Sequence, residues 1–208
     1  MNPGMFLTLI RNRGEDMLWL RAEPCVCLDP ADPTAGEHRG CSLCEYGYVY
    51  EDPVLIRGVV VQQQRDYFHV DLGFLPRGEV ILVTSANVPI DMWDKVVLTQ
   101  RAFEKKERVR RGEEGSDPLL SPYSCDVIQV SDDTTVYTAD DYEFDADKGV
   151  ITWKGNRPAT DATYIVHYRY HPVYWYTGSV ARPARWAPYY GQTMPRMGRL
   201  EQRPPVEG

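Results

Sequence analysis

The chain has 208 residues, 43% of them hydrophobic, and its 23 basic and 30 acidic side chains give a net charge of −7. This length allows one large domain, or one domain with an inserted module, and the apolar content is sufficient for a core. The acidic balance disfavours nucleic acid as the primary ligand, because nucleic-acid affinity comes largely from Lys and Arg side chains that neutralise phosphates. No apolar run approaches the roughly 18 residues of a membrane span, and no signal peptide is recognisable, so we expect a soluble protein without a membrane partner.

Residues 1–23 are predicted to form an N-terminal β-hairpin. Alternating apolar and polar residues occur at 6–10 and again at 17–21, on either side of an Asn-Arg-Gly sequence at 12–14. Two such runs around a turn that contains Gly are typical of a hairpin.

Residues 24–50 contain the clearest chemical signal. The segment is rich in Pro, Gly and Asp and poor in aliphatic residues, and it holds the pairs Cys25-x-Cys27 and Cys41-x-x-Cys44, separated by thirteen residues. Two short chelating loops can bring four thiolates to about 2.3 Å from one tetrahedral zinc ion. We therefore predict a zinc-binding module with Cys25, Cys27, Cys41 and Cys44 as ligands.

The same cysteines could instead form two disulfides or remain as four free thiols. Disulfides are disfavoured in a reducing cytoplasm, and four exposed thiols in a loop without a core would oxidise easily. His38 is an alternative ligand if Cys25 points away from the ion. With four protein ligands the ion has no open position, so the predicted role of zinc is structural.

Residues 51–177 are predicted to form one mainly β domain, a small β-barrel or sandwich. Short β-rich runs alternate with Gly and Pro, as is typical of such folds. These runs lie at 55–62, 66–72, 79–84, 95–98, 125–130, 134–137, 149–153 and 163–170. The strongly charged stretch 100–111 fits either a short helix or an exposed edge strand.

The run at 163–170 has the clearest two-residue period. One face consists of Tyr164, Val166, Tyr168 and Tyr170, and the other of Ile165, His167 and Arg169. This alternation predicts a strand with one buried face and one face in water.

Residues 178–208 are predicted to be an extended C-terminal tail. They contain five Arg, two Glu and five Pro, so the tail is near +3 and the rest of the chain near −10. With few aliphatic residues the tail cannot easily offset its ordering entropy through a core of its own. Its large side chains could anchor in a partner's groove or fold back on their own domain. They are Trp186, Tyr189, Tyr190, Met194 and Met197.

We expect no enzymatic activity. The chain has four His and lacks the nucleophile elbow, the phosphate-binding loop and the His-Glu-x-x-His motif. Cys125, at the start of an apolar run, is predicted to be a buried and inert thiol. Six aspartates between 132 and 147 lack the ligand order of an EF-hand and are expected to be solvated turn residues.

Three segments resemble a pattern met in virion proteins of tailed bacteriophages. An Asp-Tyr pair precedes a short strand within 136–144, then comes Gly-Val-Ile-Thr-Trp at 149–153, then Thr-Tyr-Ile-Val-His-Tyr-Arg-Tyr at 163–170. Together with the preceding cysteine module and Arg110-Arg111-Gly112, they make residues 25–172 similar to phage neck proteins of the head-closure or stopper kind.

The resemblance implies a structural virion protein of the head-tail connector, a β-barrel subunit that joins the portal to the tail and helps retain DNA. It implies a homo-oligomeric ring with sixfold or twelvefold symmetry, which contacts portal or adaptor and tail proteins and lets packaged DNA pass without sequence-specific binding. The protein would be made in the host bacterial cytoplasm and reside in the virion neck. Alternatives are another phage tail or baseplate component, or a zinc-ribbon nucleic-acid-binding protein, which the acidic residues around the cysteines disfavour.

Overall fold

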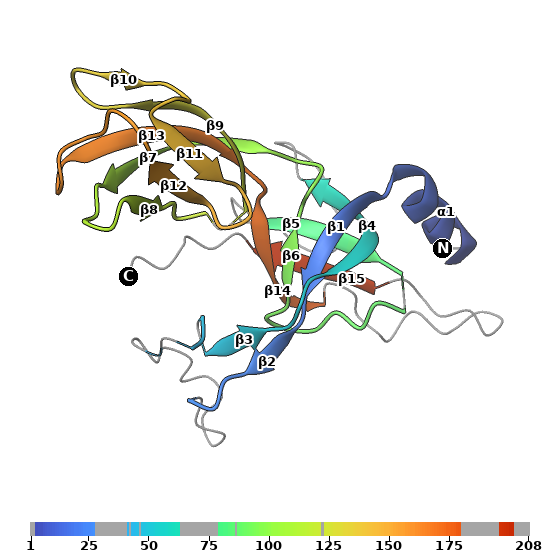
Figure 1. Cartoon of the computed structure of the whole chain (residues 1–208). Helices are drawn as coiled ribbons and strands as arrows, with labels where there is room; N and C mark the ends of the chain where they lie inside the picture. Colours follow the sequence, from blue (N-terminus) through green and yellow to red (C-terminus); the bar gives the residue numbers. More distant parts are fainter. Residues whose placement is uncertain are drawn as a thin grey trace. The chain divides into compact units, whose positions relative to one another are not determined.

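A computed structural model of the chain describes residues 3–27, 41, 43–45, 47–62, 79–85, 87–121, 123–179 and 196–201. These residues are mainly β-strand, as predicted, with a single helix among them. They divide into two compact units, one from Met1–Val97 and Val173–Arg203 and the other from Leu98–Pro172 (Figure 1). No helix in this part of the chain has the length and apolar character that a bilayer crossing requires.

Six strands of the first unit form a closed antiparallel barrel in the order β1-β4-β5-β15-β14-β6. Their bounds are Glu15–Leu20 (β1), Val54–Gln62 (β4), Glu79–Thr84 (β5), Lys95–Val97 (β6), Val173–Ser179 (β14) and Arg196–Glu201 (β15). Buried side chains of these strands include Met17, Ile56, Val60, Leu82, Val96 and Tyr174. Because the last strand pairs with the first, the barrel has no open sheet edge.

The hairpin prediction for the N-terminus is wrong in its first arm, which is the helix α1 (Pro3–Arg13). Pro3 begins the helix, where its missing N–H is not needed. Gly14, expected in a β-turn, follows the helix, and its N–H donates to the carbonyl of Ile10 at 2.9 Å. A Cβ at position 14 would lie 2.2 Å from that same oxygen. The glycine therefore permits the helix end rather than a hairpin.

The structure divides the rest of the chain differently from the predicted domain 51–177 and tail 178–208. The chain leaves the barrel after Val97, builds the second unit, and returns at Val173. Within the predicted tail, β15 pairs with both β5 and β14 and completes the barrel. The expected strand 66–72 lies outside the described residues, as do the proposed anchors Trp186, Tyr189, Tyr190 and Met194.

The second unit contains a four-stranded sheet in the order β10-β9-β13-β7 and a three-stranded sheet in the order β11-β12-β8. The first sheet comprises Phe103–Arg110 (β7), Ser124–Ser131 (β9), Val136–Tyr137 (β10) and Thr163–Tyr170 (β13), and the second Ser116–Pro118 (β8), Tyr142–Asp145 (β11) and Val150–Trp153 (β12). Residues from both sheets share one apolar core, which includes Val109, Val130, Ile151, Trp153, Tyr164 and Val166. The unit is therefore a small sandwich.

Strands β13 and β7 test two predictions made from the sequence. Along β13, Tyr164, Val166 and Tyr168 are buried while Ile165 and Arg169 are exposed, which confirms the predicted alternation. The ambiguous stretch 100–111 is a strand rather than a helix, and among the described residues β7 pairs only with β13.

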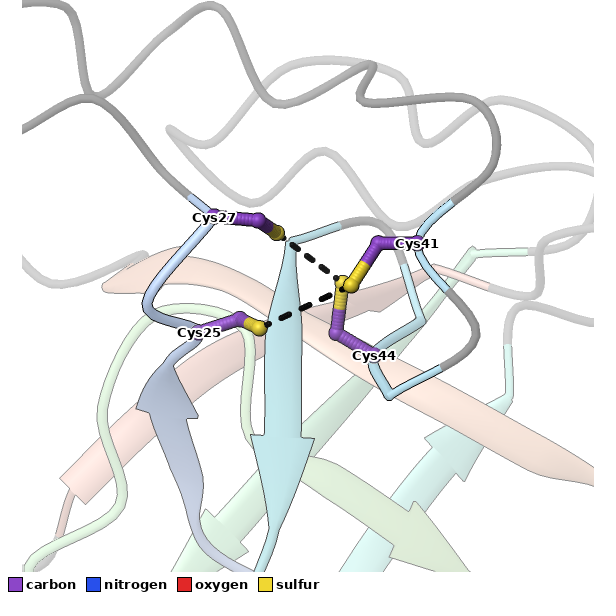
Figure 2. A group of neighbouring side chains, drawn as sticks. All are labelled: Cys25, Cys27, Cys41 and Cys44. Carbon is purple, nitrogen blue, oxygen red and sulfur yellow. Dashed lines mark hydrogen bonds between the residues drawn. The ribbon is translucent and has the colours of Figure 1, made fainter.

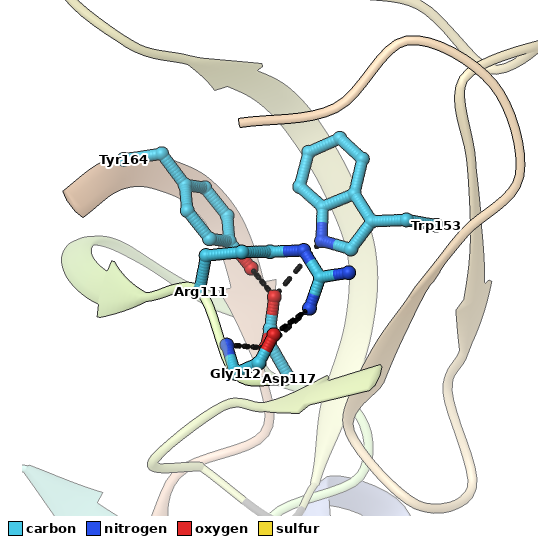
Figure 3. A network of polar contacts seen from close by, with 5 residues as sticks. All are labelled: Arg111, Gly112, Asp117, Trp153 and Tyr164. Atoms are coloured by element: carbon cyan, nitrogen blue, oxygen red, sulfur yellow. Dashed lines mark hydrogen bonds and ion pairs between the residues drawn. The ribbon is translucent and has the colours of Figure 1, made fainter. Parts of the chain in front are cut away.

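A carboxylate lies inside the sandwich core. Asp117 in β8 is 1% exposed and accepts hydrogen bonds from Trp153 Nε1 at 2.9 Å, Tyr164 Oη at 2.8 Å and the Gly112 N–H at 2.7 Å (Figure 3). The buried guanidinium of Arg111 lies 3.5 Å from the same carboxylate. Asp117 thus satisfies the polar groups of both core aromatics, which would otherwise be buried without partners.

A second buried carboxylate serves the neighbouring tyrosine of β13. Glu107 in β7 accepts the hydroxyl of Tyr168 at 2.5 Å and the N–H of Leu120 at 3.0 Å. Burial and the adjacent carboxylates raise the pKa of both Tyr164 and Tyr168 above the usual tyrosine range. Both phenols are therefore fixed as neutral hydrogen-bond donors in the folded sandwich.

Candidate metal centre

The four predicted ligands meet at the end of a two-stranded ribbon that extends from the barrel strands. Cys25 and Cys27 follow β2 (Ala22–Pro24), and Cys41 and Cys44 precede β3 (Tyr48–Tyr50), which pairs with β2. All four sulfurs lie within 4.8 Å of one another. Figure 2 shows the two pairs of side chains directed toward each other from the two segments.

The sulfur positions fit one tetrahedral ion. A metal bonded to four thiolates at about 2.3 Å requires neighbouring sulfurs to be roughly 3.8 Å apart. The Sγ atoms of Cys25 and Cys41 are 3.9 Å apart, and those of Cys27 and Cys44 are 3.4 Å apart. Both separations exceed the roughly 2.0 Å of a disulfide, and all four cysteines are free thiols. These two sulfur separations are therefore close to those of a tetrahedral metal site, and all six lie within 4.8 Å.

The backbone around the cysteines is fixed by hydrogen bonds from the ribbon. The N–H of Cys25 donates to the carbonyl of Gly47 at 2.8 Å, and Glu45 and Tyr48 exchange two hydrogen bonds at 2.9 and 3.0 Å. Gly47 has a φ of 86°, which a residue with a side chain rarely adopts. This turn brings Cys44 back toward Cys25.

The pKa values of three of the thiols, Cys27, Cys41 and Cys44, are shifted by their surroundings. A hydrogen bond from the backbone N–H of Leu43 lowers the pKa of Cys41 to about 7. Hydrogen bonding with the thiol of Cys25 raises the pKa of Cys27, and burial raises that of Cys44. A bound cation would favour the thiolate form of all four ligands.

The other sequence candidates do not join this cluster. His38 lies outside the described residues. Cys125 is in the second unit and is half-buried, not fully buried as predicted. Burial raises the pKa of its thiol. Among the turn aspartates, Asp132 and Asp141 accept backbone N–H groups at 2.8 Å. This is a local turn function of the kind expected from the sequence.

One contact of the cysteine cluster was not foreseen from the sequence. Glu45, next to Cys44, forms an ion pair with the buried Lys95 of β6. The two residues are 50 positions apart, and a charged residue at the start of a short apolar strand gives no signal that it will be buried. Only the closed barrel brings them together.

Comparison with known proteins identifies one family. None of the curated proteins compared with the chain matches it. The family model described as domain of unknown function (DUF4815) matches residues 51–180, a stretch that runs from the end of the cysteine ribbon through the sandwich to β14. The four cysteines lie before the matched region. Because the match covers more than half of the chain, the protein belongs to the DUF4815 family.

Proposed function

We propose that the four cysteines bind one zinc ion and that this ion has a structural role. The proposal rests on the convergence of four sulfurs within 4.8 Å. Thiolates favour zinc among the common divalent ions, and zinc prefers the tetrahedral arrangement that the sulfur separations fit. Four protein ligands occupy every position, so the ion has no site for water or substrate. Zinc would therefore hold the ribbon segments together in place of an apolar core.

Elemental analysis of the purified full chain tests the zinc proposal. We expect one zinc per chain, which is lost in Cys44→Ser and retained in Cys125→Ser, the matched control for removal of a thiol outside the cluster. If the bound metal were iron, the site would stand but its proposed occupant would be wrong, because four thiolates also suit an iron centre. A wild-type protein without any bound metal would contradict the proposal.

We further propose that the protein is a non-enzymatic structural protein of a tailed-phage virion, a subunit of the homo-oligomeric ring that connects portal and tail proteins at the neck and helps retain DNA. The segments that resemble phage neck proteins, 136–144, 149–153 and 163–170, supply strands β10 to β13 of the sandwich. These strands contribute most of the buried residues of the sandwich core. The resemblance therefore covers a folded module and not scattered residues, which supports it.

Electron microscopy of lysates tests the virion role. A stop codon at Trp19 of the phage gene should give filled or leaking heads beside separate, complete tails. Joined particles with incomplete tails would place the protein in the tail or baseplate instead. Normal infectious particles would refute the virion role, and the zinc centre would then have to be explained by another binding function.

A further inference from the structure

Lys95 lies where the barrel closes. It is the first residue of β6, the short strand between β1 and β14, and it stands opposite Leu20 of β1 and Trp175 of β14. Its side chain is only 10% exposed. A lysine ammonium at such a position needs compensating groups nearby, since burial of an unpaired charge is costly.

The ammonium group of Lys95 is held by two aromatic rings and one carboxylate. Its Nζ lies 3.8 Å from the ring centroid of Tyr50 and 5.2 Å from that of Trp175, and Trp175 Nε1 donates to the Tyr50 hydroxyl at 3.2 Å. The carboxylate belongs to Glu45 and makes the ion pair of Lys95 within the described residues. Burial lowers the pKa of Lys95 and the Glu45 charge opposes this shift.

Glu45 reaches Lys95 from the cysteine cluster. It directly follows Cys44, and its backbone N–H and carbonyl are both bonded to Tyr48. An ion bound to Cys44 would fix the backbone of the next residue and thereby hold the Glu45 carboxylate on Lys95. If the cluster opened, Lys95 would keep its place in β6 but lose its only charged partner among the described residues.

We infer that the Glu45–Lys95 pair is a positioning element that couples the four-cysteine centre to the closing strand of the barrel. The inference rests on the proposed metal site and assigns it a second effect, the stabilisation of β6 at a distance from the ligands. By thermodynamic linkage the coupling is reciprocal. The free energy by which a bound ion strengthens the Glu45–Lys95 pair equals the free energy by which the pair strengthens binding of the ion. Residues beyond the ligands commonly change metal affinity about 10- to 100-fold.

Zinc titrations of four variants of the full chain test the coupling. We expect Glu45→Gln and Lys95→Met each to weaken zinc binding about tenfold although all four cysteines remain. The double variant should bind no more weakly than either single variant, because both lose the same interaction. Lys148→Met is the control, since it removes a lysine that is paired with Asp145 on the surface of the other unit. It should bind zinc like the wild type.

Amide hydrogen exchange supplies a second measurement. Exchange in β6 would not respond to zinc if the ion stabilised only the segments that carry the cysteines. Zinc removal should speed amide exchange in β6 of the wild type but leave it unchanged in the double variant. Glu45→Gln alters a side chain that is 38% exposed, so it keeps the test open if Lys95→Met does not fold. The coupling would be overturned if every variant bound zinc with unchanged affinity, or if zinc removal did not change amide exchange in β6 of the wild type. Either result would leave the proposed metal site intact. A wild type without metal would overturn both.

Discussion

The buried pair of Arg111 and Asp117 should respond unequally to removal of its two members. Asp117 accepts three hydrogen bonds besides the contact with Arg111. Arg111 has fewer partners, since it bonds the carbonyl of Gly112 and its Nε has no hydrogen-bond partner within the described residues. Without the guanidinium the buried carboxylate therefore keeps three hydrogen-bond donors, whereas without the carboxylate the buried guanidinium keeps fewer partners.

The structure gives approximate magnitudes for both substitutions. Arg111→Met keeps the apolar stem and leaves Asp117 with its three donors, so we expect a loss of about 2 kcal/mol in the free energy of unfolding, comparable to one charged hydrogen bond. Asp117→Asn removes the compensating charge of a guanidinium that is 3% exposed. Breaking a buried pair in this way costs about 3–5 kcal/mol. The aspartate substitution should therefore be the more destabilising by at least about 1 kcal/mol.

Hydrogen exchange of the full chain under increasing urea can measure these losses in the sandwich itself. Peptides covering β12 and β13 report the opening of the core in which both residues lie. Tyr164→Phe is the matched control, because it removes one hydrogen bond to Asp117 and should cost about 1 kcal/mol. Equal losses for Arg111→Met and Asp117→Asn, or a larger loss for the arginine variant, would refute the proposed asymmetry.

Three further predictions concern pH and packing. Burial holds the pKa of Tyr164 and Tyr168 above the usual value. The stability that these tyrosines contribute should therefore be complete below about pH 10 and fall as the pH rises further. An absorbance titration in which both phenols ionise without unfolding would contradict this. The hydroxyl of a neighbouring tyrosine and backbone N–H groups lower the pKa of Asp132 to about 2, so stability should fall between about pH 4 and pH 2. Asp132→Asn should lose that dependence in acid denaturation and the exposed control Asp133→Asn should keep it. Gly58→Ala should destabilise the barrel by about 1–3 kcal/mol in thermal melting, because its Cβ would lie 3.0 Å from a backbone oxygen of β5; an unchanged melting temperature would refute this.

The features that could be predicted from the sequence are those with a local physical cause. The alternation along β13 follows from the two-residue period of a strand, and it identified Tyr164 and Tyr168 as core residues. The four cysteines could be assigned to one centre because chelating pairs require short spacings and a segment without its own core. In both cases the residues that interact share a simple pattern over a few positions.

The features that were missed depend on distant partners. The hairpin interpretation failed because Gly14 suits a turn and a helix end equally well, and the choice depends on its approach to Ile10. The six residues of β15 lie in a segment rich in Arg and Pro, and they become a strand because β5 and β14 supply hydrogen bonds on both sides. The buried Lys95 likewise depends on a glutamate 50 positions earlier.

The aromatic cluster of the sandwich places three tyrosines around one tryptophan in the second unit. Trp153 is the single tryptophan between Leu98 and Pro172, and the rings of Tyr137, Tyr142 and Tyr164 stand 5.0, 6.0 and 5.2 Å from it. At such separations, light absorbed by these phenols passes to the indole. In the first unit Trp93 lies 5.6 Å from Tyr48, so it is the Trp153 share of the sensitised emission, the part that Trp153→Phe removes, that should report the integrity of the sandwich core. The loss of that emission would follow the unfolding of this unit even while the barrel remains intact.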